Sequence, residues 1–137
     1  MVMFDHMIVP LDRARINSTA AVAARAFADD PMFTFIFPAA DQRPRLLRRF
    51  FAAGLRYGVL FGRVDTTDDG AGTALWLTPG QTDITPGRMI RSGMALLPLT
   101  LGMGAFRRFL AFVSYGDRVH SELMREPHWY LLNLAVD

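Results

Sequence analysis

The last ten residues of the chain, 128–137, constrain its fold more than any other stretch. They read His-Trp-Tyr-Leu-Leu-Asn-Leu-Ala-Val-Asp and form an apolar run with aromatic and β-branched members. A run of about six to eight residues with hardly a polar side chain is typical of a strand buried on both faces at the centre of a sheet. Strand-like segments precede this run and none follows it. We therefore expect one flank of its backbone to lack a hydrogen-bonding partner from the same chain.

The composition excludes several classes of protein. A length of 137 residues fits one domain at most, with a sizeable core. The chain has no cysteine, which excludes disulfides, thiolate metal sites and a cysteine nucleophile and makes the reducing cytoplasm the expected location. All 15 basic residues are arginine, so no lysine is present to form a Schiff base. A formal charge of +2 is too small to indicate a nucleic-acid partner.

Hydrophobic periodicity and turn signals predict an α/β domain. Proline and glycine clusters mark the boundaries, and Asp68-Asp69-Gly70 is a good hairpin turn. In chain order we expect a strand at 7–11, a helix at 19–28 capped by Asn17 or Ser18, an aromatic loop at 32–38, a helix from Asp41, strands at 59–67 and 72–78, a helical region at 85–124 broken at Pro98, and the final strand.

The most apolar helical window, 92–106, is too short for a membrane span. It holds 15 residues, is interrupted by Pro98, and would have to cross a hydrocarbon layer of about 30 Å. We expect no integral membrane segment. A peripheral membrane protein built around 94–112 is a third possibility, after the two functions discussed below.

The usual signatures of metal sites and hydrolases are absent from the sequence. His6, His120 and His128 lie far apart in the chain, with no partner at i+3 or i+4, so no metal site is expected. Ser114 and Ser121 lie in helical sequence without the strand-to-helix turn of a hydrolase nucleophile.

Several side chains are weak candidates for chemistry. Asp30 lies beside the aromatic loop and either faces a substrate amine or is a polar residue at the end of the preceding helix. Phe33 and Phe37 of that loop either plug the core or line a small-molecule site. Tyr130 and Asn133 are polar residues on the final strand, where one of them is expected to point into a cavity or a hydrogen-bond network.

Three stretches, in this order, resemble the GNAT family of acetyl-CoA-dependent N-acyltransferases. They are 28–38 with Asp-Asp-Pro and the aromatic loop, 74–80 with Ala-Leu-Trp-Leu-Thr-Pro-Gly, and 129–137. The resemblance covers nearly the whole chain. It implies a mainly antiparallel central sheet flanked by helices, with acetyl-CoA as cofactor and a small amine as acceptor.

The resemblance also implies roles for individual residues. In that family the last strand splays from its neighbour and free backbone groups near its carboxyl end hold the pantetheine arm and polarise the thioester carbonyl. Leu134, Ala135 and Val136 match those positions. Phe33, Phe37 and Trp76 would contact the acceptor. The catalytic base and acid stay open, with Asp30, Tyr130 and Asn133 as weak candidates.

One departure from the family pattern is large. Members continue with a glycine-containing loop that binds the CoA pyrophosphate at a helix N-terminus, and this sequence stops at Asp137 before it. We therefore expect residues 1–137 to be one GNAT-like domain, incomplete at its C-terminus, that binds acetyl-CoA weakly or not at all. The alternative is a non-catalytic half-domain that forms homo-oligomers through its open final strand.

Overall fold

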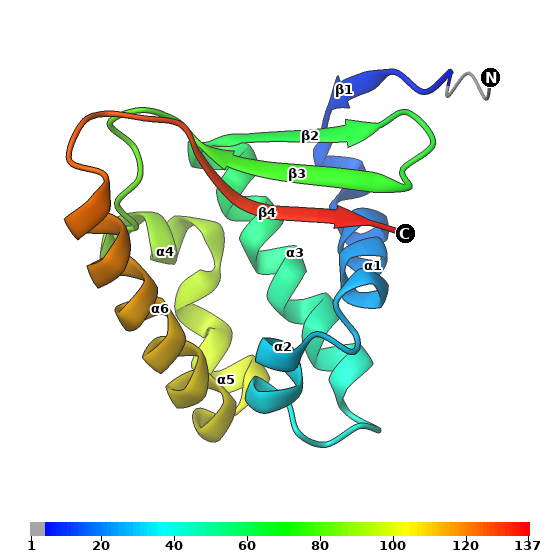
Figure 1. Ribbon diagram of the computed structural model, residues 1–137. Coiled ribbons are helices and arrows are strands. Elements are labelled where there is room, and N and C mark those ends of the chain that lie inside the picture. The colour runs from blue at the N-terminus through cyan, green and yellow to red at the C-terminus, as the bar shows by residue number, and fades with distance from the viewer. Residues whose placement is uncertain (1–4) are drawn as a thin grey trace.

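A computed structural model describes residues 5–137 and places a four-stranded antiparallel sheet at one side of the molecule (Figure 1). The strand order follows the chain, and each strand pairs with the next. The predicted fold class, an α/β protein with an antiparallel sheet flanked by helices, is therefore confirmed. The strands are β1 (Ile8–Pro10), β2 (Arg63–Thr67), β3 (Gly72–Leu77) and β4 (Tyr130–Val136).

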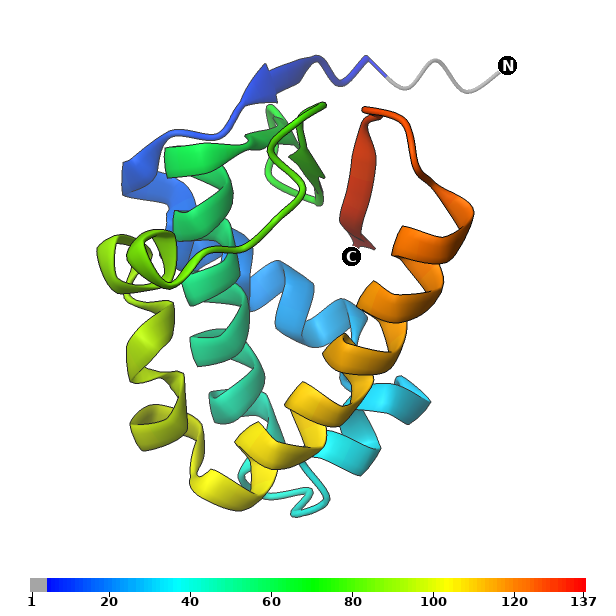
Figure 2. The same ribbon diagram turned by 90° about the vertical axis from the view of Figure 1, so that its left-hand side faces the viewer.

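The helices lie on one side of the sheet, below it in Figure 1, and leave the other face of the sheet without a covering layer. At the centre of this helical layer, α3 lies between α1 and the segment that runs from α4 to α6 (Figures 1 and 2). The helices are α1 (Ile16–Ala26), α2 (Pro31–Ile36), α3 (Arg43–Phe61), α4 (Pro86–Ser92), α5 (Leu97–Leu101) and α6 (Met103–Leu123), with 3-10 turns η1 (Arg13–Arg15) and η2 (Met94–Leu96).

The hairpin of β2 and β3 forms at the predicted turn. Gly70 has a φ of 80°, a conformation that glycine adopts without a steric cost. The pairing sets Val64 against Leu75 and Thr66 against Thr73, all four buried toward the helices. Because successive side chains alternate between the faces of a strand, Arg63, Asp65 and Trp76 lie on the uncovered face.

Two predicted boundaries are wrong at the first and third helices. The first helix begins at Ile16, so Asn17 and Ser18 lie inside it, while Asp12 accepts a hydrogen bond from the Ala14 N–H at the preceding turn. The third helix continues to Phe61, through residues assigned to the strand at 59–67. Its end is fixed at Gly62, where a Cβ would lie 2.4 Å from the carbonyl oxygen of Trp76, so only glycine allows this close approach.

The predicted aromatic loop is in fact a short helix, α2. Asp30 caps it, because its carboxylate accepts hydrogen bonds from the N–H groups of Met32 and Phe33, at 2.9 and 3.4 Å. Pro31 stands in the first turn, where its missing N–H costs nothing. The cap turns Phe33 into the core, where its ring contacts those of Phe27, Phe37, Phe50 and Phe51.

The predicted break at Pro98 is also in the wrong place. The helical region is interrupted at Gly93 and Gly102, which have φ values of 84° and 90°, whereas Pro98 lies in the first turn of α5. Gly102 therefore serves chain reversal rather than close helix packing, and no atom lies within 4 Å of its missing Cβ. None of the helices between residues 5 and 137 is long and apolar enough to cross a membrane.

The last strand is less buried than the sequence predicts. Within β4 only Ala135 is buried, at 2% exposure, while Leu134 and Val136 are 57% and 67% exposed. The expectation of a strand buried on both faces is therefore wrong, because β4 lies at the edge of the sheet and its outer face has no covering layer. The expectation of an unpartnered flank describes β4 correctly within the part of the chain that the structure covers.

Candidate functional site

The free flank of β4 is the feature on which the functional interpretation depends. β4 pairs with β3 along one flank, and no strand among residues 5–137 pairs with the other. Had Leu134 to Val136 been hydrogen bonded on both flanks, no room would remain for a ligand along the strand. The flank instead offers backbone groups to an extended partner molecule.

The direction of the backbone groups separates the three predicted cofactor residues. The Asp137 N–H donates to the Ala71 carbonyl at 2.8 Å, and Ala135 lies opposite Thr73. Because N–H and C=O groups alternate in direction along a strand, those of Ala135 face β3, whereas those of Leu134 and Val136 point to the free flank. Only Leu134 and Val136 therefore offer unused main-chain groups.

A bulge lies in β4 at Leu132, two residues before Leu134. Leu75 lies opposite Asn133, but Trp76 lies opposite Leu131, so Leu132 is the additional residue of β4 at this position. A bulge disrupts the ladder locally and strengthens the twist of the strand.

The carboxyl end of β4 is anchored to α1 by an ion pair. The Arg25 guanidinium donates to one Asp137 carboxylate oxygen through Nε at 3.0 Å and through a terminal nitrogen at 2.6 Å. These hydrogen bonds, with the attraction between the charges, lower the pKa of Asp137 and raise that of Arg25. The Arg25 and Asp137 side chains are 57% and 41% exposed, so the pair contributes little to stability and marks where the end of β4 meets α1.

The predicted catalytic candidates do not gather at one point. Tyr130 and Asn133 lie on the helix-facing side of β4, opposite Leu77 and Leu75, and both are half-buried. Asp30 is engaged as the cap of α2, a role that the sequence did not predict because the following residues were expected to form a loop.

The predicted substrate residues separate into two groups. Phe33 and Phe37, at 3% and 1% exposure, belong to the core, where a substrate does not reach them. Trp76 lies on the uncovered face of the sheet. There it lines a shallow hollow of about 290 Å³ together with Trp129, Arg63 and Asp65.

The structure also brings together two histidines that appear unrelated in the sequence. Nε2 of His120, in the last turn of α6, lies 2.6 Å from Nε2 of His128, and the His120 ring stacks on Tyr130 with 4.3 Å between centroids. Nδ1 of His128 lies 2.6 Å from the Glu126 carbonyl oxygen, which can only accept, so Nδ1 donates to it. The chain reversal after α6 makes this contact, and spacing along a helix gives no signal for it.

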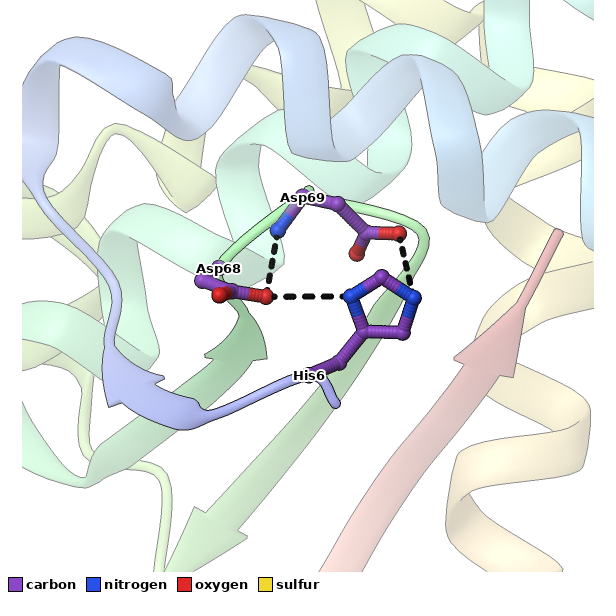
Figure 3. Close-up of side chains that lie close together, drawn as sticks. All are labelled: His6, Asp68 and Asp69. Carbon is purple, nitrogen blue, oxygen red and sulfur yellow. Dashed lines mark hydrogen bonds and ion pairs between the residues drawn. The ribbon is translucent and has the colours of Figure 1, made fainter. Parts of the chain in front are cut away.

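A second cluster ties the N-terminal segment to the hairpin turn (Figure 3). Nδ1 and Nε2 of His6 face the carboxylates of Asp68 and Asp69, at 3.3 and 3.5 Å. Hydrogen bonds from the Thr67 hydroxyl and the Ala71 N–H, aided by His6, lower the pKa of Asp69. These three residues have the ligand types of a metal site and are exposed, but each ring nitrogen of His6 already pairs with its own carboxylate.

Comparisons with known proteins support the fold. No protein-family model matches the chain, and no curated protein matches it. Among solved structures, the chain is similar to "histone acetyltransferase HPA2 and related acetyltransferase" from Corynebacterium glutamicum, with a TM-score of 0.59 and 20% sequence identity. The match covers 96% of this chain and 60% of the other, so this chain spans about three fifths of that structure's length.

Proposed function

We propose that this chain carries the acyl-binding strand of an acetyl-CoA-dependent N-acyltransferase of the GNAT type, which acetylates a small amine. The observation that carries the proposal is the pair of outward main-chain groups at Leu134 and Val136 on the free flank of β4. The fold shared with an acetyltransferase structure is a second, coarser support.

The residues present fit an acyl thioester arm. The arm is neutral and extended, and residues 130–136 contain no charged side chain that would repel or compete with it. Acetyl-CoA would supply the activated acetyl group. The strand would bind and orient that group, and an outward N–H would donate to the oxygen that becomes negative during attack by the amine. Backbone donors serve this role without any particular side chain.

We expect millimolar acetyl-CoA to shift the amide resonances of Leu134 and Val136, with a smaller effect on Ala135, in the ¹H–¹⁵N spectrum of the chain. Binding should be weaker than micromolar, because the strand flank supplies contacts to the acyl arm alone. Calorimetry that gave micromolar binding would contradict this weak affinity, and unchanged Leu134 and Val136 resonances would overturn the proposed site.

Proline substitutions provide a matched control for the two kinds of amide. Val136→Pro removes an outward N–H and should abolish the acetyl-CoA shifts while the sheet stays folded, since edge strands tolerate proline. Ala135→Pro removes an N–H directed at the buried Thr73, which should lower the free energy of unfolding by roughly 1–3 kcal/mol.

Assembly through β4 is a second candidate function. Its support is the same free flank together with the exposed apolar side chains of Leu134 and Val136, because such an edge also pairs with another chain. A stable dimer that does not respond to acetyl-CoA would favour assembly over catalysis.

A further inference from the structure

We propose that the hollow between Trp76 and Trp129 binds the acceptor as a cation, an alkylammonium group held by the two indole rings and the carboxylate of Asp65. The identification of the cation as the acceptor rests on the proposed acyltransferase function, but binding of a cation in the hollow can be tested without acetyl-CoA.

The two indole rings meet edge to face and both line the hollow. Their centroids are 6.4 Å apart with an interplanar angle of 88°, and Trp129 is 53% exposed. A large aromatic side chain left in solvent at the mouth of a hollow is more typical of a binding surface than of a core. The face of an indole ring carries negative potential and attracts cations within about 6 Å.

Asp65 adds a fixed negative charge beside these rings. Its side chain is only 14% exposed and lies on the same face as Trp76, on the neighbouring strand. Nε of Arg63 is 3.0 Å from each of the two carboxylate oxygens, yet the Arg63 side chain is 58% exposed. A carboxylate has about four acceptor sites, so an ammonium group can share the Asp65 carboxylate with the half-exposed Arg63.

The hollow lies on the outer face of the sheet, at the start of β4. Trp129 directly precedes β4, and Trp76 pairs with Leu131 at the bulge, a few residues before Leu134. A volume of about 290 Å³ accommodates an amine of several non-hydrogen atoms and fits no large ligand. A neutral ligand of the same size would lack the attraction of Asp65 and of the ring faces, and an anion would find Arg63 already paired with Asp65.

The test uses n-butylammonium as probe, with 1-butanol and butyrate as its neutral and anionic counterparts. The chain has only two tryptophans, and both line this hollow, so the two indole N–H resonances report on it without interference. We expect n-butylammonium to shift both resonances saturably with a millimolar dissociation constant, and the other two compounds to bind at least about tenfold more weakly. Equal effects of all three compounds would overturn the inference.

Two variants at the ion pair should act in opposite directions. Asp65→Asn should weaken n-butylammonium binding by about tenfold, whereas Arg63→Gln should strengthen it because the carboxylate loses its competitor. Asp117→Asn, which removes an exposed carboxylate on α6, is the matched control and should have no effect. Unchanged affinity in either folded variant would refute the role of the carboxylate, so the test still decides if the other variant proves unstable.

The two proposals can fail separately. In one outcome, n-butylammonium shifts the indole resonances but acetyl-CoA does not shift the amide resonances of Leu134 and Val136. This outcome would support the cation site and refute the acyltransferase proposal. Amide shifts with acetyl-CoA but no indole shifts with n-butylammonium would support the acyl-binding strand and refute this acceptor site.

Discussion

Gly54 and Gly58 lie one turn apart on α3 but meet different surroundings. A Cβ on Gly58 would lie 2.6 Å from a methyl group of Val64 and 2.9 Å from Cγ of Leu75, both buried in the sheet, whereas a Cβ on Gly54 would meet no atom within 4 Å. The absence of a side chain at Gly58 therefore sets the distance between α3 and the sheet. At Gly54 the absence of a side chain only adds flexibility to the unfolded chain.

Alanine at these two glycines should change stability in opposite directions. Gly58→Ala should lower the free energy of unfolding by about 1–3 kcal/mol through overpacking. Gly54→Ala should raise it by about 0.5–1 kcal/mol, because alanine favours the helix interior. Urea denaturation of both variants measures the difference, and a destabilised Gly54→Ala would show that α3 is packed more tightly there than the structure indicates.

At the scale of elements, α6 depends on its last turn for contact with β4. The helix packs mainly on α5 and α2, and its second half is largely exposed apart from the half-buried Val113, Val119 and His120. The hydrogen bond between the Nε2 atoms of His120 and His128 and the stacking of His120 on Tyr130 join this end of α6 to the start of β4.

Removal of the histidine contact should loosen the end of α6. His120→Ala loses one hydrogen bond and one ring stack, together about 1.5 kcal/mol, which predicts roughly tenfold faster amide hydrogen exchange over residues 113–123. Ser121→Ala, whose hydroxyl bonds only to the Arg118 carbonyl within the helix, is the control and should exchange at the original rate. Equal exchange in the two variants would mean that packing on α5 and α2 is sufficient to hold the helix.

For the whole molecule, the free flank of β4 predicts a tendency to self-associate. The edge is seven residues long and carries neither proline nor charge, the features by which proteins usually protect an edge. Leu134→Arg should therefore shift the chain toward the monomer in sedimentation or native mass measurements. Leu99→Arg changes a leucine that is 83% exposed on α5 and should leave the association unchanged. A wild-type chain that stays monomeric at high concentration would exclude assembly as the function of β4.

The sequence by itself determined the features that depend on neighbouring residues. The hairpin follows from Asp68-Asp69-Gly70, and the order of the strands and helices, apart from α2, follows from periodicity and from proline and glycine. The apolar run at 128–137 contains the edge strand β4 of the sheet that residues 5–137 form. The predicted boundaries at Asn17, Val59 and Pro98 are wrong, because helix ends depend on caps and on close contacts with other elements that the intrinsic propensity of a residue does not encode.

Only the tertiary structure decided which groups meet. The register of β4 against β3 directs the main-chain N–H and C=O groups of Leu134 and Val136 to the free flank and those of Ala135 to β3. The cap at Asp30 turns the Phe33 ring into the core. Chain reversal after α6 brings His120 to His128, and the start of β4 brings Trp129 to Trp76. Each of these contacts depends on how helices and strands pack against one another. A local stretch of sequence does not determine that packing, so only the folded chain shows which residues meet.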